Sequence, residues 1–316
     1  MKSPILRWSA TVLFALLVLI IGDRAAAAPD REIRIGVLLS QDAGPYQEAL
    51  DGFKYYFEQQ GVKARLDVAS LKGDAAQAGA ALQQLRAQPL DLLFTLGTLA
   101  TQSALRADVG MPIVAGLVLN KTDLGNAPNV TGVVLQFPVE VELRWLQRLL
   151  PGQRNIGVLY NPAENQRRID VAAETARTLG LTLQARRVES PRDLPDELEG
   201  LSKDADVLWS VADQMVMTPQ TAKPILLFSF RNRVPVIGLS QSWVKAGALY
   251  ALDRDYADIG AQCGEMALKL LQGTPVSALP PVPPRKVLYS INLKTASHMK
   301  LDIPRALIQG AQEVIE

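Results

Sequence analysis

Short apolar runs alternate with helical segments along most of the chain, and this alternation restricts the fold more than any other feature. The runs are rich in Val, Ile and Leu and lack polar alternation, which indicates strands that are covered on both faces. In the first half, strands are predicted at 33–39, 64–68, 90–96 and 112–117, and helices at 49–60, 75–87 and 99–106. We therefore expect an α/β fold with parallel sheets and right-handed crossovers.

The same pattern begins again in the second half of the chain. After a helix predicted at 139–150, the segment NIGVLY at 155–160 matches IRIGVLL at 33–39. Further strands are predicted at 183–188, 207–212, 235–239, 248–252 and 287–292. Since 316 residues exceed the usual size of one domain, we expect two doubly wound, Rossmann-like lobes with a ligand cleft between them. The predicted first lobe is 30–138 with about 241–275, and the second is 139–240 with about 285–316.

Residues 1–27 predict a signal peptide for export. Lys2 and Arg7 precede an apolar run at 10–21, and small residues follow at 25–28. This run is shorter than the roughly 20 residues of a spanning helix, so cleavage after Ala27 is favoured over an uncleaved anchor. The sole cysteine, Cys263, is far from the cleavage zone, which predicts a periplasmic protein without a lipid anchor.

Charge and motifs exclude several classes of function. The chain carries 33 Lys and Arg against 32 Asp and Glu, and this balance argues against binding to nucleic acid. It has one histidine, His298, and no zinc-protease, P-loop or serine-hydrolase motif. We therefore expect no catalytic residue, no metal and no cofactor, and a monomer that binds a small molecule.

Candidate ligand-binding residues follow the predicted strands, because open parallel sheets bind ligands at the carboxyl ends of their strands. In the first lobe they are Ser40, Gln41, Asp42, Thr98, Leu99, Thr101 and Asn120. In the second lobe they are Tyr160, Asn161, Asp213, Ser240, Gln241 and Trp243.

Two of these positions suggest opposite charges on the ligand. Thr98 and Thr101 flank a predicted helix start after Gly97, where free N–H groups suit a carboxylate. Asp213 at a strand tip is suited to a cationic group. Plain helix capping, by Thr98 or by Asp213 for a helix beginning near Thr218, is the alternative in both cases.

Six segments resemble the ABC-transporter substrate-binding protein family that includes the tryptophan-binding TrpX proteins. They are RIGVLLS (34–40), NVTGV (129–133), IGVLYNP (156–162), VPVIGLSQSWVKAGALYAL (234–252), DYADIGAQCGEMALKLLQG (255–273) and INLKTASHMKLDIP (291–304). The resemblance implies a type I periplasmic-binding-protein fold, closure on a small molecule, often an aromatic amino acid, and an ABC permease as partner. Relatives commonly have Asp-Pro in place of Asn120-Lys121, and often acidic residues in place of 240–242, so a ligand ammonium is expected less strongly here.

These observations predict a periplasmic solute-binding protein that delivers its ligand to an ABC permease. An alternative is a ligand-sensing subunit for a membrane kinase or cyclase, and a weaker one is an enzyme on the same fold. Closure is expected about a hinge where the chain crosses between lobes, near Pro138, Ser240 and residues 280–292.

Overall fold

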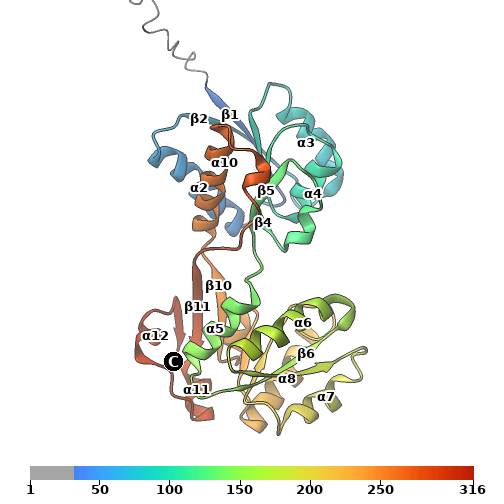
Figure 1. Ribbon diagram of the computed structural model, residues 1–316, viewed down its shortest axis with the longest axis vertical. Helices are drawn as coiled ribbons and strands as arrows, with labels where there is room; N and C mark the ends of the chain where they lie inside the picture. The colour runs from blue at the N-terminus through green and yellow to red at the C-terminus, as the bar shows by residue number, and fades with distance from the viewer. Residues whose placement is uncertain (1–31) are drawn as a thin grey trace, which may run out of the picture.

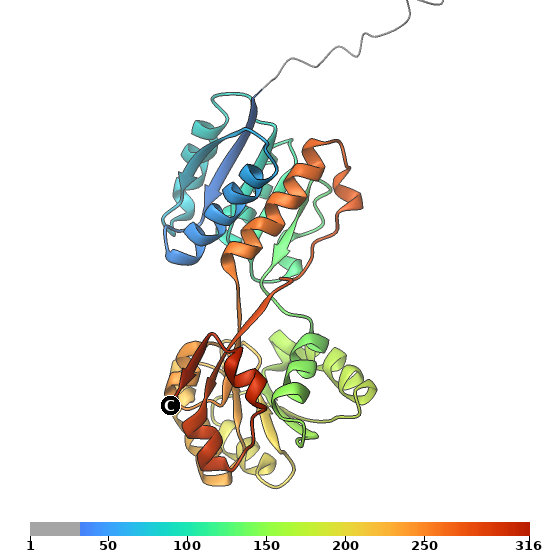
Figure 2. The same cartoon turned by 90° about the vertical axis from the view of Figure 1, so that its left-hand side faces the viewer.

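Two lobes joined by a narrow waist make up the protein in the computed structural model, which describes residues 32–316 (Figures 1 and 2). The predicted signal peptide lies outside the described residues. No helix within 32–316 combines the length and the apolar character needed to cross a membrane.

The first lobe contains a five-stranded parallel sheet with the order β2-β1-β3-β4-β5. Helices α2 and α10 cover one face of this sheet, and α3 and α4 cover the other. The bounds are β1 (Ile33–Leu39), β2 (Ala64–Ser70), β3 (Leu92–Leu96), β4 (Ile113–Val118), β5 (Val130–Val134), α2 (Gly44–Gln59), α3 (Ala78–Leu85), α4 (Thr98–Arg106) and α10 (Tyr256–Leu271), with short 3₁₀ turns η1 (Ala75–Gln77), η2 (Lys121–Leu124) and η3 (Val276–Ala278).

The second lobe contains a seven-stranded sheet with the order β12-β11-β10-β9-β8-β6-β7. Its strands pair in parallel except for β10 with β11. One face packs against α5, α6, α11 and α12, and the other against α7, α8 and α9. The bounds are β6 (Asn155–Tyr160), β7 (Thr182–Arg187), β8 (Val207–Trp209), β9 (Val236–Gly238), β10 (Tyr250–Arg254), β11 (Val287–Asn292), β12 (Glu313–Ile315), α5 (Val139–Leu149), α6 (Pro162–Thr178), α7 (Leu194–Leu201), α8 (Pro219–Asn232), α9 (Gln241–Ala246), α11 (Leu293–Met299) and α12 (Arg305–Gln309). The predicted architecture of two doubly wound α/β lobes is confirmed.

Helices α2 and α10 approach each other so closely that glycine is required at the contact. A Cβ atom on Gly52 would lie 1.9 Å from the carbonyl oxygen of Ala257. One on Gly260 would lie 1.8 Å from the carbonyl oxygen of Ala49. This contact fixes α10 to the first lobe, although α10 follows most of the second lobe in sequence.

The predicted lobe boundaries need one correction. Residues 241–254, expected in the first lobe, lie in the second, because β10 pairs with β9 and β11. The chain enters the first lobe again only at α10. It stays there at least to Val282, whose N–H donates to Gly132 and whose carbonyl accepts from the N–H of Val134.

The chain crosses between the lobes three times, at 135–138, at 254–255 and at 286–287. Ser240 was expected near a crossing, but it lies between β9 and α9, within the second lobe. The first crossing leaves the carboxyl end of β5 and the second leaves the carboxyl end of β10. The carboxyl edges of the two sheets are therefore the edges that border the waist.

Candidate functional site

The loops after β1 and β3 interlock at the carboxyl edge of the first lobe. The Ser40 hydroxyl accepts a hydrogen bond from the N–H of Ala100 at 2.9 Å. Gly97 has a φ of 93°, and a Cβ there would lie 2.4 Å from the Ser40 hydroxyl oxygen and 2.8 Å from the Tyr46 ring. Glycine is therefore needed at 97 both for its conformation and for its space.

The two threonines predicted to act together have different environments. Thr101 is completely buried, and its hydroxyl donates to the Gly97 carbonyl at 2.9 Å and contacts the Thr95 hydroxyl at 2.8 Å. Its hydroxyl is therefore satisfied inside the lobe, and contact of Thr101 with ligand stays a prediction. Thr98 is half-buried, and its hydroxyl accepts from the N–H of Leu119 at 3.3 Å, which joins the loops after β3 and β4.

The other predicted residues of the first lobe lie near this edge and differ in exposure and in hydrogen bonding. Gln41 and Asp42 are exposed after β1, and Leu99 is half-buried on α4. The N–H of Asn120 donates to the Asp123 carboxylate at 3.3 Å, and its side-chain oxygen accepts from Thr122. Asn120 is therefore the N-cap residue of η2, and its side-chain oxygen is engaged by Thr122.

Asp213 organises the backbone after β8. Its Oδ1 accepts from the N–H groups of Met215 at 2.9 Å, Val216 at 2.5 Å and Met217 at 3.3 Å, and its Oδ2 accepts from Asn161 N–H at 3.2 Å. A carboxylate has about four acceptor positions, so this group is satisfied without a ligand. Asp213 therefore has a backbone role, and its contact with a ligand cation stays a prediction. It caps a turn, and Thr218 is the N-cap of α8.

The remaining predicted residues of the second lobe divide into buried and half-buried groups. Asn161 is buried and caps α6, accepting from Ala163 N–H at 3.1 Å. Tyr160 is buried, and its hydroxyl donates to the Gln166 side chain at 3.1 Å. Ser240, Gln241 and Trp243 are half-buried at the start of α9. The Gln241 amide donates to Glu313 of β12.

A buried polar cluster lies between α5, α6 and the sheet, and it was not predicted from the sequence. The Glu142 carboxylate accepts from Arg168 at 2.8 Å and from the Trp209 indole at 3.0 Å. Burial raises the pKa of Glu142, and the Arg168 guanidinium opposes that rise. The Tyr250 hydroxyl is buried beside it without a hydrogen-bond partner among the described residues, and burial raises its pKa well above the usual value. The only sequence signal for this cluster was Glu142, an acidic residue on the apolar face of the helix predicted at 139–150.

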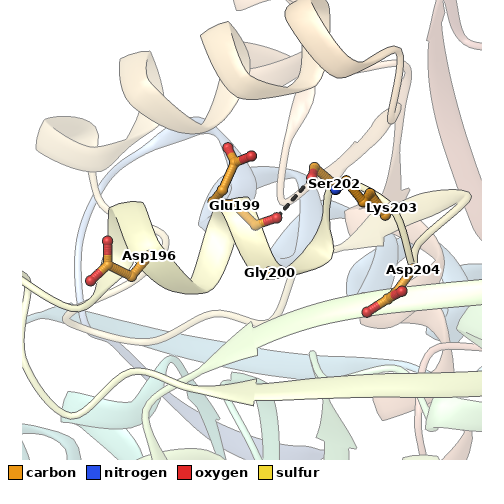
Figure 3. A pocket seen from close by; sticks show the side chains of 6 residues that line it. All are labelled: Asp196, Glu199, Gly200, Ser202, Lys203 and Asp204. Carbon is orange, nitrogen blue, oxygen red and sulfur yellow. Dashed lines mark hydrogen bonds between the residues drawn. The ribbon is translucent and has the colours of Figure 1, made fainter.

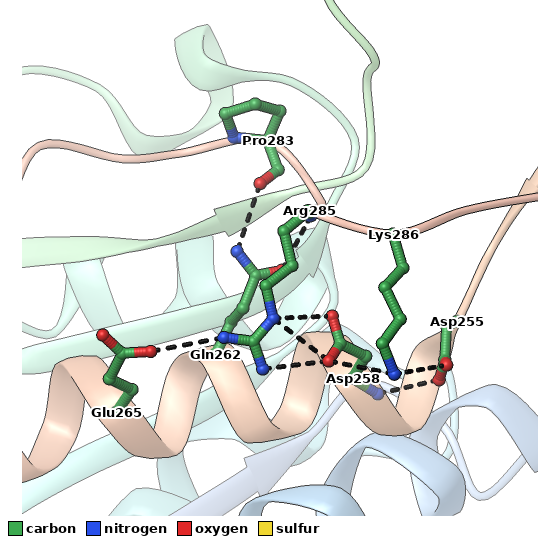
Figure 4. A network of polar contacts seen from close by, with 7 residues as sticks. All are labelled: Asp255, Asp258, Gln262, Glu265, Pro283, Arg285 and Lys286. Carbon is green, nitrogen blue, oxygen red and sulfur yellow. Dashed lines mark hydrogen bonds and ion pairs between the residues drawn. The ribbon is translucent and has the colours of Figure 1, made fainter.

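The third crossing is held along α10 by side chains (Figure 4). Arg285 donates to both oxygens of the Asp258 carboxylate at 2.9–3.1 Å and to Glu265 at 3.3 Å. Lys286 pairs with Asp255 and Asp258, both at 3.3 Å. The chain is thereby fixed to the first lobe as far as Lys286.

Arg254 connects the first two crossings. Its Nε donates to the carbonyl of Leu135 at 2.9 Å, and its guanidinium lies 4.8 Å from the centre of the Phe137 ring. Arg254 belongs to the second sheet and Leu135 follows the first, so this contact links the two lobes.

Two surface hollows in the described part of the chain lie away from the waist. One is at the C-terminal end of α7, lined by Asp196, Glu199, Gly200, Ser202, Lys203 and Asp204 (Figure 3). The other lies beside Arg34 and Arg65, where β1 and β2 begin. Both are at the amino edges of their sheets, opposite the predicted ligand loops. Within residues 32–316, no group of three or more His, Cys, Asp or Glu is arranged to hold a metal ion.

Comparison with known proteins identifies similar sequences and folds. A family model described as "ABC transporter substrate binding protein" matches residues 32–315. A tyrosine-binding protein of Clostridioides difficile (strain R20291) is 22% identical over 264 residues, which cover 79% of this chain and 76% of that protein.

Two solved structures share the fold over 90% of this chain. One is an ABC domain from Streptococcus pneumonia in complex with L-Trp, with 21% identity, a TM-score of 0.59 and all of that chain covered. The other is the ligand-free, open structure of a substrate-binding protein with adhesive properties from Clostridium difficile, with 22% identity, a TM-score of 0.76 and 99% of that chain covered.

Proposed function

Because the chain belongs to the family of ABC transporter substrate-binding proteins, we propose that it captures a small solute between its lobes in the periplasm and delivers it to an ABC permease. The observation that carries this proposal is the arrangement of the two sheets. Both turn their carboxyl edges, where parallel sheets bind ligands, toward the waist at which the chain crosses three times.

We propose an amino-acid-like solute as the ligand. One relative is named a tyrosine-binding protein, and one similar structure is a complex with L-Trp. The half-buried Thr98 lies at the start of α4, where helix N–H groups suit a carboxylate. Half-buried Trp243 lies at the other carboxyl edge and offers an aromatic surface to an apolar side chain.

Capture is tested by a thermal-shift screen of the mature protein against amino acids, nucleosides and small carboxylates. A ligand present at 100 times its dissociation constant stabilises the native state by about 2.7 kcal/mol, which is readily measured. Small-angle scattering with the best hit should then show compaction. Absence of any stabilising solute across the panel, in protein first unfolded and refolded to release bound ligand, would refute capture of these solutes.

Delivery is tested by uptake of the labelled hit into cells with and without this protein. Loss of uptake in the deletion strain, restored by the plasmid-borne gene, supports transport. Unchanged uptake combined with a lost transcriptional response to the solute would support the sensing alternative instead.

Location is tested by cell fractionation and by sequencing the mature N-terminus. A periplasmic protein that begins at Ala28 is expected. Membrane-bound protein that retains residues 1–27 would contradict this part of the proposal.

A further inference from the structure

The position of Asp253 follows from the register of β10. Ala251 pairs with Gly238 in parallel, so the two residues point to the same face of the sheet. A Cβ on Gly238 would meet the Cβ of Trp243 at 2.6 Å, which identifies that face as the one covered by α9. Asp253, two residues after Ala251, shares this face, whereas Arg254 points to the opposite one. Asp253 therefore lies at the carboxyl edge on the same side as Trp243.

On the side of the first lobe, Asp253 adjoins Tyr256, which in turn lies near Tyr46. Tyr256 begins α10, and its pKa is raised first by burial and next by the nearby Asp253 carboxylate. Tyr46 lies in turn near Tyr256 and against Gly97. Neighbouring tyrosines thus connect Asp253 to the loop after β3 in the first lobe, and Asp253 shares a face of the second sheet with α9.

The Asp253 carboxylate differs from four neighbouring acidic groups, each of which is satisfied by a cation or by backbone N–H groups. Asp255 and Asp258 pair with Lys286, Glu142 pairs with Arg168, and Asp213 is satisfied by backbone N–H groups. Within residues 32–316, Asp253 forms no ion pair, and the one hydrogen bond that it accepts comes from the N–H of Arg254 at 2.8 Å. It is half-buried, so an unpaired charge here is partly desolvated and keeps most of its acceptor positions.

We propose that Asp253 is the specificity-determining residue that receives the cationic group of the ligand, a primary ammonium, with Tyr256 beside it and Tyr46 next to Tyr256. The proposal rests on the proposed capture of an amino-acid-like solute and replaces the role first expected of Asp213. A carboxylate gives an ammonium a charge-assisted hydrogen bond, and the tyrosine rings favour a nearby cation. Since Asp253 sits at a crossing and Thr98 in the first lobe, a zwitterion that contacts both groups would favour the closed form.

The test compares L-tyrosine and L-tryptophan with their deaminated analogues, 3-(4-hydroxyphenyl)propionate and indole-3-propionate. Calorimetry of the parent protein should show the amino acid binding at least about tenfold more tightly than its analogue. Asp253→Asn removes the charge at constant size. It should therefore weaken binding of the amino acid about tenfold or more and leave binding of the analogue unchanged. Asp253→Glu keeps the charge and should retain the preference. Asp196→Asn, at the α7 hollow, is the matched control and should bind as the parent does.

The outcomes separate this inference from the function on which it rests. If Asp253→Asn binds the amino acid as tightly as the parent, Asp253 is not the receptor, and capture itself stands. If the parent binds a nucleoside or a carboxylate without an amine but neither amino acid, both the solute class and the role of Asp253 are overturned. If Asp253→Asn does not fold, loss of the preference in Asp253→Ser with retention in Asp253→Glu supports the role, and the reverse pattern refutes it.

Discussion

Gly52→Ala tests the close contact between α2 and α10. The added Cβ would lie 1.9 Å from the Ala257 carbonyl oxygen, and real Cβ atoms essentially never come within 3.0 Å of such a neighbour. The helices must therefore separate locally by at least about 1.1 Å, the difference between these values. Because a backbone carbonyl cannot rotate away as a side chain can, we expect a cost near the upper end of the usual overpacking range of about 1–3 kcal/mol.

Alanine also favours a helix over glycine by about 1 kcal/mol, so the expected net loss is about 2 kcal/mol. For a protein of this size, that loss lowers the melting temperature by about 4–8 °C. Circular dichroism is the appropriate assay, because Trp145, Trp209 and Trp243 all lie in the second lobe and fluorescence would report mainly on that lobe.

The matched control is Gly79→Ala, which lies in α3 of the same lobe with nothing within 4 Å of the new Cβ. It should be neutral or stabilising by up to about 1 kcal/mol, through helix propensity alone. If Gly52→Ala is as stable as Gly79→Ala, the close approach of the two helices is refuted.

Three further predictions concern the interior and the hinge. Thr101→Val should destabilise the first lobe by about 1–2 kcal/mol in urea unfolding without changing ligand affinity, since it removes the hydroxyl that bonds to the Gly97 carbonyl and to the buried Thr95 hydroxyl; a selective loss of affinity would contradict the buried role. The Cys263 thiol is buried and its pKa is raised to about 12, so it stays protonated well above pH 8; it should react with a thiol-specific disulfide reagent at pH 8 only after denaturation, and fast reaction of the native protein would contradict its burial. Arg285→Gln should speed amide exchange at 285–288, because it removes the paired hydrogen bonds to Asp258; exchange as slow as in the parent would show that the third crossing is held by other contacts.

The secondary structure was largely predictable because buried parallel strands leave a clear apolar signature. The strands at 33–39, 155–160 and 287–292 have the predicted bounds. The predicted strand at 207–212 is in fact Val207–Trp209, since the Asp213 turn follows soon after. The lobe to which 241–254 belongs depends on strand pairing between distant segments, which apolar periodicity does not report.

The positions of the candidate loops at the carboxyl edges were predictable, but the hydrogen-bonding state of each side chain was less so. Strand ends identify which loops border the waist, and Thr98, Asn120 and Trp243 lie there. Sequence cannot tell which hydroxyl or carboxylate is already satisfied by the protein, and that distinction separates Thr98 from Thr101. The role proposed for Asp253 was not predicted for a related reason, because it depends on which cations lie near this carboxylate in the folded residues 32–316.

The return of α10 to the first lobe also governs the order in which the protein can fold. The first lobe lacks a covering helix until residue 271 is available, and the second lacks β11 until residue 292. Proteins made of consecutive domains generally fold from the N-terminus as synthesis proceeds. Here neither lobe can be completed before nearly the whole polypeptide has been made. A chain truncated at residue 255 would leave Phe53 and the rest of that face of the first sheet without its partner helix, and both lobes would remain unfinished together.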